Sequence, residues 1–210
     1  MPSCVSINKK GAIKVGDTEY KNMKQDVRRQ TKTWVKGESN SYIEFKRTMA
    51  TNTRYHSGYA NKDFSSEELS AEVLKALKSF VSDENINSIV VTVPAKFNVN
   101  QKTATIEAAR LAGFKKCELL QEPIAAAMAY GLTADEKNGI WMVFDFGGGT
   151  FDAALLKVED GIMQVYDTEG DNYLGGKNLD YVIVDNIVVP QLRKDYALDN
   201  YLSNPDKKEI

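Results

Sequence analysis

The sequence is poor in histidine and cysteine, and this scarcity excludes several kinds of catalytic site. His56 is the only histidine in the 210 residues, which leaves no Ser-His-Asp or Cys-His couple and no histidine-rich metal site. The two cysteines, Cys4 and Cys117, lie far apart and match no CxxC or zinc pattern, so we expect free thiols in a reducing compartment. Any chemistry must therefore use carboxylates, lysines, hydroxyls and backbone amides.

The sequence also lacks a long apolar run and an excess of charge of either sign. No apolar run approaches the roughly 18 residues that span a bilayer, and the N-terminal region lacks the apolar segment of a signal peptide. Lys and Arg number 27 and Asp and Glu number 29, for a net charge of −2, which removes the main electrostatic motive for binding nucleic acid or an anionic membrane. We therefore expect a cytoplasmic protein that binds neither.

The composition is otherwise that of an ordinary globular protein. Hydrophobic residues make up 42% and charged residues 27% of the chain, which argues against disorder and against a coiled coil. A chain of this length forms one large domain or two lobes and buries roughly 70% of its unfolded surface.

Short elements are predicted in the first third of the chain. A turn that contains Gly11 is expected to join two strands, 5–7 and 12–15. Ser41 and Glu44 have the spacing of a capping box, which predicts a short helix from about Tyr42 to Met49. Lys46 lies on this helix.

A strand-helix-strand pattern follows a second capping signal. Ser65 begins an amphipathic helix, and the β-branched run 89–93 predicts a strand that is buried on both faces and ended by Pro94. Asn98 and Gly113 occupy the positions of the two caps of the next helix. Parallel strands joined through a helix are the expected arrangement.

A nearly apolar helix then leads to a change of pattern. Residues 117–121 read as a strand, and Pro123 opens an alanine-rich helix that Gly131 is suited to end. A short helix without a polar face belongs between two packed layers. The polar stretch 133–139 is the candidate boundary between two lobes.

The last third predicts an antiparallel meander and one helix. The strands are expected at 140–144 and 151–158, with a third strand after residue 161. Apolar residues between Leu179 and Ile187 suggest a helix that ends or kinks near Pro190.

The first turn of this meander is the most informative segment of the sequence. It contains three consecutive glycines, Gly147, Gly148 and Gly149. Without Cβ atoms their N–H groups can approach an anion closely, as phosphate-binding nests require, and Thr150 adds a hydroxyl. Asp145 and Asp152 flank the turn and could hold a hydrated Mg²⁺. For the glycines alone, a tight hairpin with no ligand is an equally good reading.

Two other phosphate motifs do not fit. Asp-Phe-Gly also occurs in protein kinases, but neither an HRD loop nor a kinase glycine-rich hairpin accompanies it here. The run Gly175-Gly176-Lys177-Asn178 approaches a P-loop, yet Asn178 stands where Ser or Thr should coordinate magnesium.

Three segments together resemble one protein family. They are Val-Val-Thr-Val-Pro-Ala-Lys-Phe-Asn at 90–98, Glu-Pro-Ile-Ala-Ala-Ala-Met-Ala-Tyr-Gly-Leu at 122–132 and Asp-Phe-Gly-Gly-Gly-Thr-Phe-Asp at 145–152. In order and spacing they resemble the ATPase domain of the seventy-kilodalton heat-shock chaperones of the DnaK type. The resemblance implies a ribonuclease H-like, actin-like α/β fold whose two lobes close over ATP or ADP with Mg²⁺. On this reading residues 1–137 belong to lobe I and residues 138–210 begin lobe II.

The resemblance also implies roles for individual residues. Lys46 would orient the attacking water or contact the γ-phosphate, although a solvated helix lysine is the alternative. Glu122 would relay the nucleotide state and order water near magnesium. The alternative is a first-turn carboxylate that stabilises its helix by ~0.5 kcal/mol, and both readings can be true. Pro94 would be the coupling switch, although a proline that ends a strand needs no such role.

The remaining roles concern the phosphates and the metal. The resemblance implies that Asp145 and Asp152 hold magnesium through water and that the glycine amides bind phosphate. Thr150 joins the catalytic candidates. Gly175 and Gly176 would be cofactor-binding residues where the second lobe approaches the cleft, although a plain loop turn fits them equally well.

The sequence also departs from the family. It is expected to lack the first phosphate loop and the segment that holds adenosine, so the domain is incomplete at both ends relative to the family. Lys96 replaces the tyrosine expected after Pro94-Ala95.

Three functions remain open at this point. The first is the ATP-binding and ATP-hydrolysing portion of a chaperone whose partners are unfolded clients, a J-domain co-chaperone and a nucleotide-exchange factor. The second is a truncated or degenerate fragment that folds without hydrolysing ATP and acts as an interaction module. The third is another actin-like ATPase or kinase, such as a sugar kinase or a filament protein.

Overall fold

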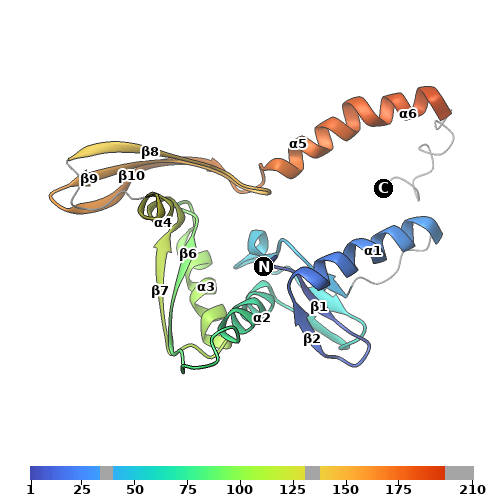
Figure 1. Cartoon of the computed structure of the whole chain (residues 1–210), viewed down its shortest axis with the longest axis horizontal. Coiled ribbons are helices and arrows are strands. Elements are labelled where there is room, and N and C mark those ends of the chain that lie inside the picture. The colour runs from blue at the N-terminus through green and yellow to red at the C-terminus, as the bar shows by residue number, and fades with distance from the viewer. Residues whose placement is uncertain (34–39, 131–137, 197–210) are drawn as a thin grey trace.

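The structure is a mixed α/β fold of several small sheets and the helices that flank them. It is a computed structural model that describes residues 1–33, 40–130 and 138–196. In Figure 1 the elements from β1 to β7 form the lower part of the molecule, and β8, β9, β10, α5 and α6 form a long band above them. Helix α4 lies between the two parts.

The first sheet has the antiparallel order β2-β1-β3. Its strands are β1 (Val5–Ile7), β2 (Ile13–Val15) and β3 (Ser41–Tyr42). The predicted hairpin is confirmed: the Asn8 side chain accepts bonds from the amides of Lys10 and Ala12 at 2.9 and 3.0 Å, and Gly11 has a φ of 76°. Cys4 and Cys117 are free, as expected.

Helix α1 (Asp17–Thr33) was not predicted from the sequence. It is mostly polar, and its buried Glu19 accepts a hydrogen bond from the buried hydroxyl of Ser6 on β1. A helix attached by a polar contact shows little of the apolar periodicity that reveals most helices.

The predicted helix from Tyr42 to Met49 is wrong in its first half. Ser41 and Tyr42 pair with β1 as strand β3, so Ser41 caps no helix. Glu44 then adopts a left-handed conformation with a φ of 59°, and a single 3₁₀ turn, η1 (Phe45–Thr48), follows. Phe45 is buried in the core of the first sheet with Val5 and Leu69. Pairing with β1 therefore overrides the local capping pattern.

Helix α2 (Ser66–Lys78) joins two packed clusters. It follows the hairpin of β4 (Tyr55–Ser57) and β5 (Lys62–Phe64) and begins with the predicted capping box of Ser65 and Glu68. Leu69 packs into the core of the first sheet, whereas Ala71 packs against α3 and the Phe114 ring.

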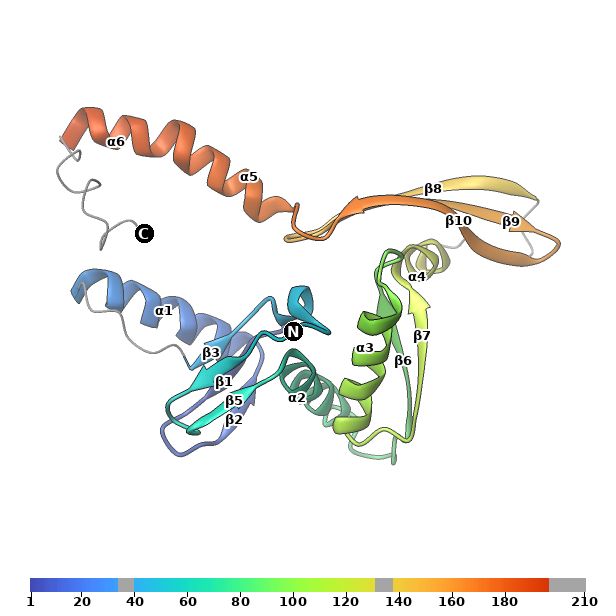
Figure 2. The same ribbon diagram turned by 180° about the vertical axis from the view of Figure 1, so that it is seen from behind.

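The predicted strand-helix-strand unit is present. Strands β6 (Ser88–Val93) and β7 (Lys116–Gln121) pair in parallel, and α3 (Val99–Leu111) connects them. Asn98 and Gln101 form the capping box of α3, and Gly113 follows it with a φ of 84°. Figure 2 shows α3 on one face of the pair.

The expectation that this strand is buried on both faces is wrong. Val90 is 60% exposed because β6 pairs only with β7 among the described strands and no described element covers the face on which Val90 lies.

Helix α4 (Glu122–Ala129) lies between two layers, as predicted. It begins directly at the end of β7, with Pro123 in its first turn. It contacts β6 and β7 on one side and all three strands of the meander on the other. Gly131 and most of the expected lobe boundary 133–139 lie outside the described residues.

The upper band consists of the predicted meander and a long helical segment. Strands β8 (Gly139–Phe146), β9 (Phe151–Glu159) and β10 (Ile162–Asp171) pair antiparallel in sequence order. The helical segment consists of α5 (Gly176–Ile183), a π-helical stretch (Val184–Val188) and α6 (Val189–Tyr196).

The helix was expected to end or kink near Pro190, and it does not end there. The helix continues to Tyr196, and the π-helical stretch lies directly before Pro190, where the missing N–H interrupts the normal bonding pattern. None of the helices in the described ranges is both long and apolar enough to cross a membrane.

We predict that Asn98→Ala lowers the stability by about 1 kcal/mol, because the amide of Gln101 loses the capping oxygen at 2.9 Å. Thermal unfolding followed by circular dichroism should show a melting temperature lower by roughly 2–4 °C. Asn100→Ala, an exposed position in the first turn of the same helix, is the control. An equal loss in both variants would contradict the role of the cap.

Candidate functional site

The glycine turn is held in a defined shape by its own strands. Strands β8 and β9 place Asp145 opposite Asp152 and Phe146 opposite Phe151. The amide of Gly147 donates to the carbonyl of Thr150 at 2.9 Å and closes the turn. The Gly147 amide is therefore engaged inside the hairpin.

The carbonyl groups of the turn are held from outside. The first amides of α5, from Gly176 and Lys177, donate to the carbonyls of Gly147 and Gly148 at 3.0 Å each. The guanidinium of Arg47, on the 3₁₀ turn η1, donates to the carbonyl of Gly149. Three successive peptide carbonyls are thus fixed by groups that lie outside the hairpin.

This arrangement determines where the amides point. The C=O and N–H of a trans peptide point in opposite directions, and the described residues include no cis peptide. The N–H groups of Gly148, Gly149 and Thr150 therefore point away from the groups that hold their carbonyls. In the part of the chain that the structure describes, these three amides donate no hydrogen bond. They form a set of backbone donors suited to an anion.

Gly175 allows α5 to approach the turn this closely. A Cβ at this position would lie 2.3 Å from the Gly149 nitrogen and 2.6 Å from the Gly148 carbonyl carbon. Only glycine fits between the two backbones. Gly175 and Gly176 are therefore part of the architecture of the hairpin, whatever the hairpin binds.

Asp152 is the most unusual carboxylate of the site. It is 6% exposed, and its Oδ1 is a buried side-chain oxygen without a hydrogen-bond partner. Burial raises the pKa of Asp152, and the neighbouring charges of Glu122 and Asp145 raise it further, while Lys46 and Lys96 oppose the rise. A desolvated carboxylate among like charges is stabilised by a nearby cation.

The oxygen donors at this position fit a hydrated magnesium ion. Asp145 and Asp152 face each other across the strands, and Glu122 is close enough to affect the pKa of Asp152. Across the described ranges, no three or more acidic, histidine or cysteine side chains are grouped as a direct metal cage. Magnesium commonly keeps several waters and binds through one or two carboxylates together with phosphates, so the donors present suit this ion.

Lys46 and Glu122 lie on the opposite side of the site. The Lys46 Nζ is 2.7 Å from Glu122 Oε1, and the Nζ lies 6.0 Å above the ring of Phe97. The two side chains are 49% and 23% exposed, so solvent screens the pair and its contribution to stability is small. Its main effect is to hold the ammonium group of Lys46 near the carboxylates.

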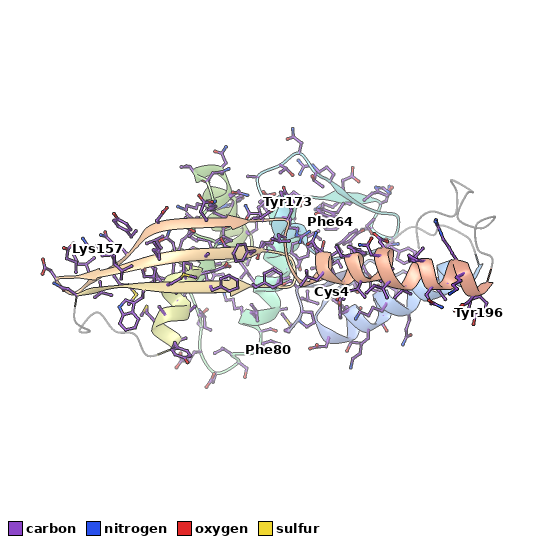
Figure 3. All side chains as sticks on the ribbon, turned by 90° about the horizontal axis from the view of Figure 1, so that it is seen from above. Cys4, Phe64, Phe80, Lys157, Tyr173 and Tyr196 are labelled. Carbon is purple, nitrogen blue, oxygen red and sulfur yellow. The ribbon has the colours of Figure 1, made fainter. Side chains whose placement is uncertain are left out.

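A small cavity lies between Lys46 and the glycine turn. It is lined by side chains from η1, the end of β6, α3, the glycine turn and the segment before α5: Lys46, Arg47, Pro94, Phe97, Gln101, Thr150, Asn172 and Tyr173. Figure 3 shows Tyr173 near the centre of the molecule, where the meander ends and α5 begins. Three residues proposed from the sequence, Lys46, Pro94 and Thr150, line the same space.

The structure therefore brings the predicted site residues into one region. Lys46 and Glu122 form an ion pair, Pro94 and Thr150 line the cavity with Lys46, the two aspartates face each other, and the glycine pair packs on the turn. Sequence reasoning missed five residues that hold these parts in place: Glu44, Arg47, Lys96, Gly170 and Lys177. Most of them act across a large sequence separation. The sequence offered a signal for two of them: Arg47 lies beside Lys46, and Lys96 replaces the tyrosine expected after Pro94-Ala95.

Gly170 and Lys96 support the carboxylate side. A Cβ at Gly170 would lie 2.4 Å from the carbonyl oxygen of Phe151 and 3.1 Å from the Cα of Asp152, so β10 can lie close to β9 only with glycine there. Lys96, after β6, pairs with Glu169 of β10 at 2.7 Å.

Comparison with known proteins shows the family to which the chain belongs. The family model described as Hsp70 protein matches residues 2–208. A chaperone protein dnaK from Cyanidium caldarium is 42% identical over 151 residues, which cover 70% of this chain and 24% of that protein. The chain thus spans about a quarter of the length of this relative.

These matches extend over most of the chain. The chain therefore belongs to the Hsp70 family.

We predict that Gly175→Ala destabilises the protein by about 1–3 kcal/mol, because the added Cβ overlaps the backbone of Gly148 and Gly149. Gly176→Ala is the matched control, since its Cβ would have no neighbour closer than 3.9 Å. Thermal unfolding should show a lower melting temperature for the first variant alone. Equal melting temperatures would contradict the close backbone contact.

We also predict that Asp152→Asn stabilises the protein at neutral pH without a divalent cation. Because the folded-state pKa of Asp152 is raised, its contribution to stability is present at low pH and is lost as the pH rises through that pKa. The neutral asparagine should therefore melt at a higher temperature at pH 7 in EDTA. Asp83→Asn, at an exposed loop position, is the control; a wild-type or lower melting temperature for Asp152→Asn would refute the prediction.

Proposed function

We propose that this chain is a portion of the ATP-binding and ATP-hydrolysing domain of an Hsp70 chaperone that assists protein folding. One observation carries the proposal: three unpaired amides of the glycine turn share one site with the Lys46–Glu122 pair and with two facing aspartates. The finer assignment is a ribonuclease H-like, actin-like fold, with residues 1–137 in lobe I and residues 138–210 beginning lobe II. The separation of the upper band from the lower part supports this division (Figure 1).

The proposed ligand is ATP or ADP with Mg²⁺. The amides of Gly148, Gly149 and Thr150 would bind phosphate oxygens, and the Thr150 hydroxyl would reach the same group. Asp145 and Asp152 would hold the metal through water. Magnesium supplies positive charge that neutralises the phosphates and the two carboxylates together.

The proposed reaction is phosphoryl transfer to water, in which the protein contributes position and charge rather than a covalent nucleophile. Lys46 lies across the cavity from Thr150 and would orient the attacking water or contact the terminal phosphate. Glu122 holds Lys46 at 2.7 Å and would order water at the same place. The amides of the turn would stabilise negative charge that develops on the phosphoryl oxygens.

Pro94 is the proposed coupling residue. It is buried at the end of β6 and lines the cavity beside Lys46. A change in the position of the nucleotide would therefore act on the end of β6, which is a strand of the lower part. Glu122 would be a second coupling residue, because α4 begins at this residue and packs on both layers.

The partners are proposed from membership of the family. In the complete protein they would be unfolded client proteins, a J-domain co-chaperone and a nucleotide-exchange factor, and the proposed location is the cytoplasm.

We predict that the purified chain binds Mg·ATP and that Asp145→Ala weakens this binding about tenfold or more, equivalent to ~1.4 kcal/mol. Lys46→Ala should retain binding within a few-fold but lower turnover by roughly 10²-fold, since its contact forms chiefly with the reacting phosphate. Isothermal titration calorimetry and release of inorganic phosphate measure the two effects.

Lys75→Ala is the control for Lys46→Ala. Lys75 also pairs with a glutamate at 2.7 Å and is 48% exposed, but it lies on α2 and outside the cavity. Absence of Mg·ATP binding by the wild-type chain would favour a folded interaction module over an ATPase. Activity that depends on a sugar, or polymerisation with ATP, would indicate another member of the actin-like class.

A further inference from the structure

Lys177 is bound to both parts of the molecule. Its backbone amide donates to the Gly148 carbonyl at 3.0 Å, so it is one of the groups that shape the glycine turn. Its ammonium group donates to both carboxylate oxygens of Glu44, at 2.9 Å each. The two residues are 133 positions apart in the sequence. One residue therefore links the turn, through its backbone, to the lower part of the molecule, through its side chain.

Glu44 has an unusual position in the lower part. It precedes η1 with a φ of 59°, in the left-handed region that few residues other than glycine adopt. Ala50, just after η1, has a φ of 60°, so two left-handed residues enclose the segment that carries Lys46 and Arg47. The orientation of this segment depends on what holds Glu44 in place.

Two cations hold the Glu44 carboxylate. Lys177 contacts both oxygens, and the Arg47 Nη1 lies 3.7 Å from Oε2. Arg47 in turn donates to the Gly149 carbonyl. Glu44 is thereby connected to the turn by two routes, one through each cation.

We propose that Lys177 and Glu44 are a positioning pair that sets the distance between the glycine turn and Lys46. The inference rests on the proposed function, because it concerns the geometry of the same site. Neither side chain contacts the nucleotide: Lys177 acts through the Gly148 peptide, and Glu44 acts through the 3₁₀ turn that carries Lys46.

The exposure of Glu44 distinguishes this pair from the Lys96–Glu169 ion pair, which also links the two parts. The side chains of Lys177 and Glu44 are each 38% exposed, whereas Lys96 is 31% and its partner Glu169 is 85% exposed. Solvent screens the second pair more strongly. The contact of one ammonium with two oxygens also restricts the orientation of the carboxylate, which a contact with one oxygen does not.

The test uses Lys177→Met, which keeps the length of the side chain and removes its charge. In the full chain without nucleotide, hydrogen exchange of the Gly176 and Asn178 amides should become about five-fold faster. With Mg·ATP, the dissociation constant should rise about five-fold. Lys194→Met, on the exposed surface of α6, is the control and should change neither value.

Two further variants separate positioning from a general loss of structure. Lys177→Arg keeps a donor for Glu44 and should restore both wild-type values. In a double-mutant cycle, Lys177→Met with Glu44→Gln should be no worse than Glu44→Gln alone, because Glu44→Gln already removes the ion pair with Lys177. Circular dichroism of each variant checks that the chain is folded.

The two readouts distinguish failure of this inference from failure of the proposed function. Faster exchange with no Mg·ATP binding by any variant would overturn the nucleotide site and support the positioning pair. Wild-type exchange and affinity in Lys177→Met, additive losses in the double mutant, or no rescue by arginine would overturn the pair.

Discussion

The geometry of the site depends on one contact, the packing of the first turn of α5 against the glycine turn between β8 and β9. Gly175 brings the two backbones within a distance that admits no Cβ, and the next two amides bind the turn's carbonyls. Because these carbonyls are occupied, the opposite ends of the same peptides are the groups that remain for a ligand. The free backbone amides of the glycine turn thus form the centre of the site, and the charged side chains lie around them.

The two aspartates of the site belong to the upper band, whereas three cations near them belong to the lower part of the molecule. The upper band contributes Asp145 and Asp152, which face each other; Asp152 is buried, and Asp145 is exposed. The lower part contributes Arg47 and Lys96, two cations that bond to this band, and Lys46, which pairs with Glu122 at the start of α4. The like charges of Asp145 and Glu122 around the buried Asp152 favour a cation at this position.

Much of the fold was predictable because local chemistry and tertiary packing agreed. The capping boxes at Ser65 and Asn98, the turn at Gly113 and the meander all appear as expected. The helix expected at Tyr42 failed because strand pairing with β1 competes with a local cap and wins. In the same way, the glycines, aspartates and Lys46 were visible in the sequence, whereas Glu44 and Lys177 acquire their roles only from a contact across 133 residues. No short-range pattern encodes such a contact.

The hydrogen bonds between α5 and the glycine turn also have an electronic consequence. The positive end of the helix dipole donates into the carbonyls of Gly147 and Gly148, and hydrogen bonds in series polarise one another. The N–H groups of Gly148 and Gly149 belong to these same peptides, so they become stronger donors than isolated amides. The helix would thereby strengthen the attraction of these amides for an anion with which it makes no contact of its own.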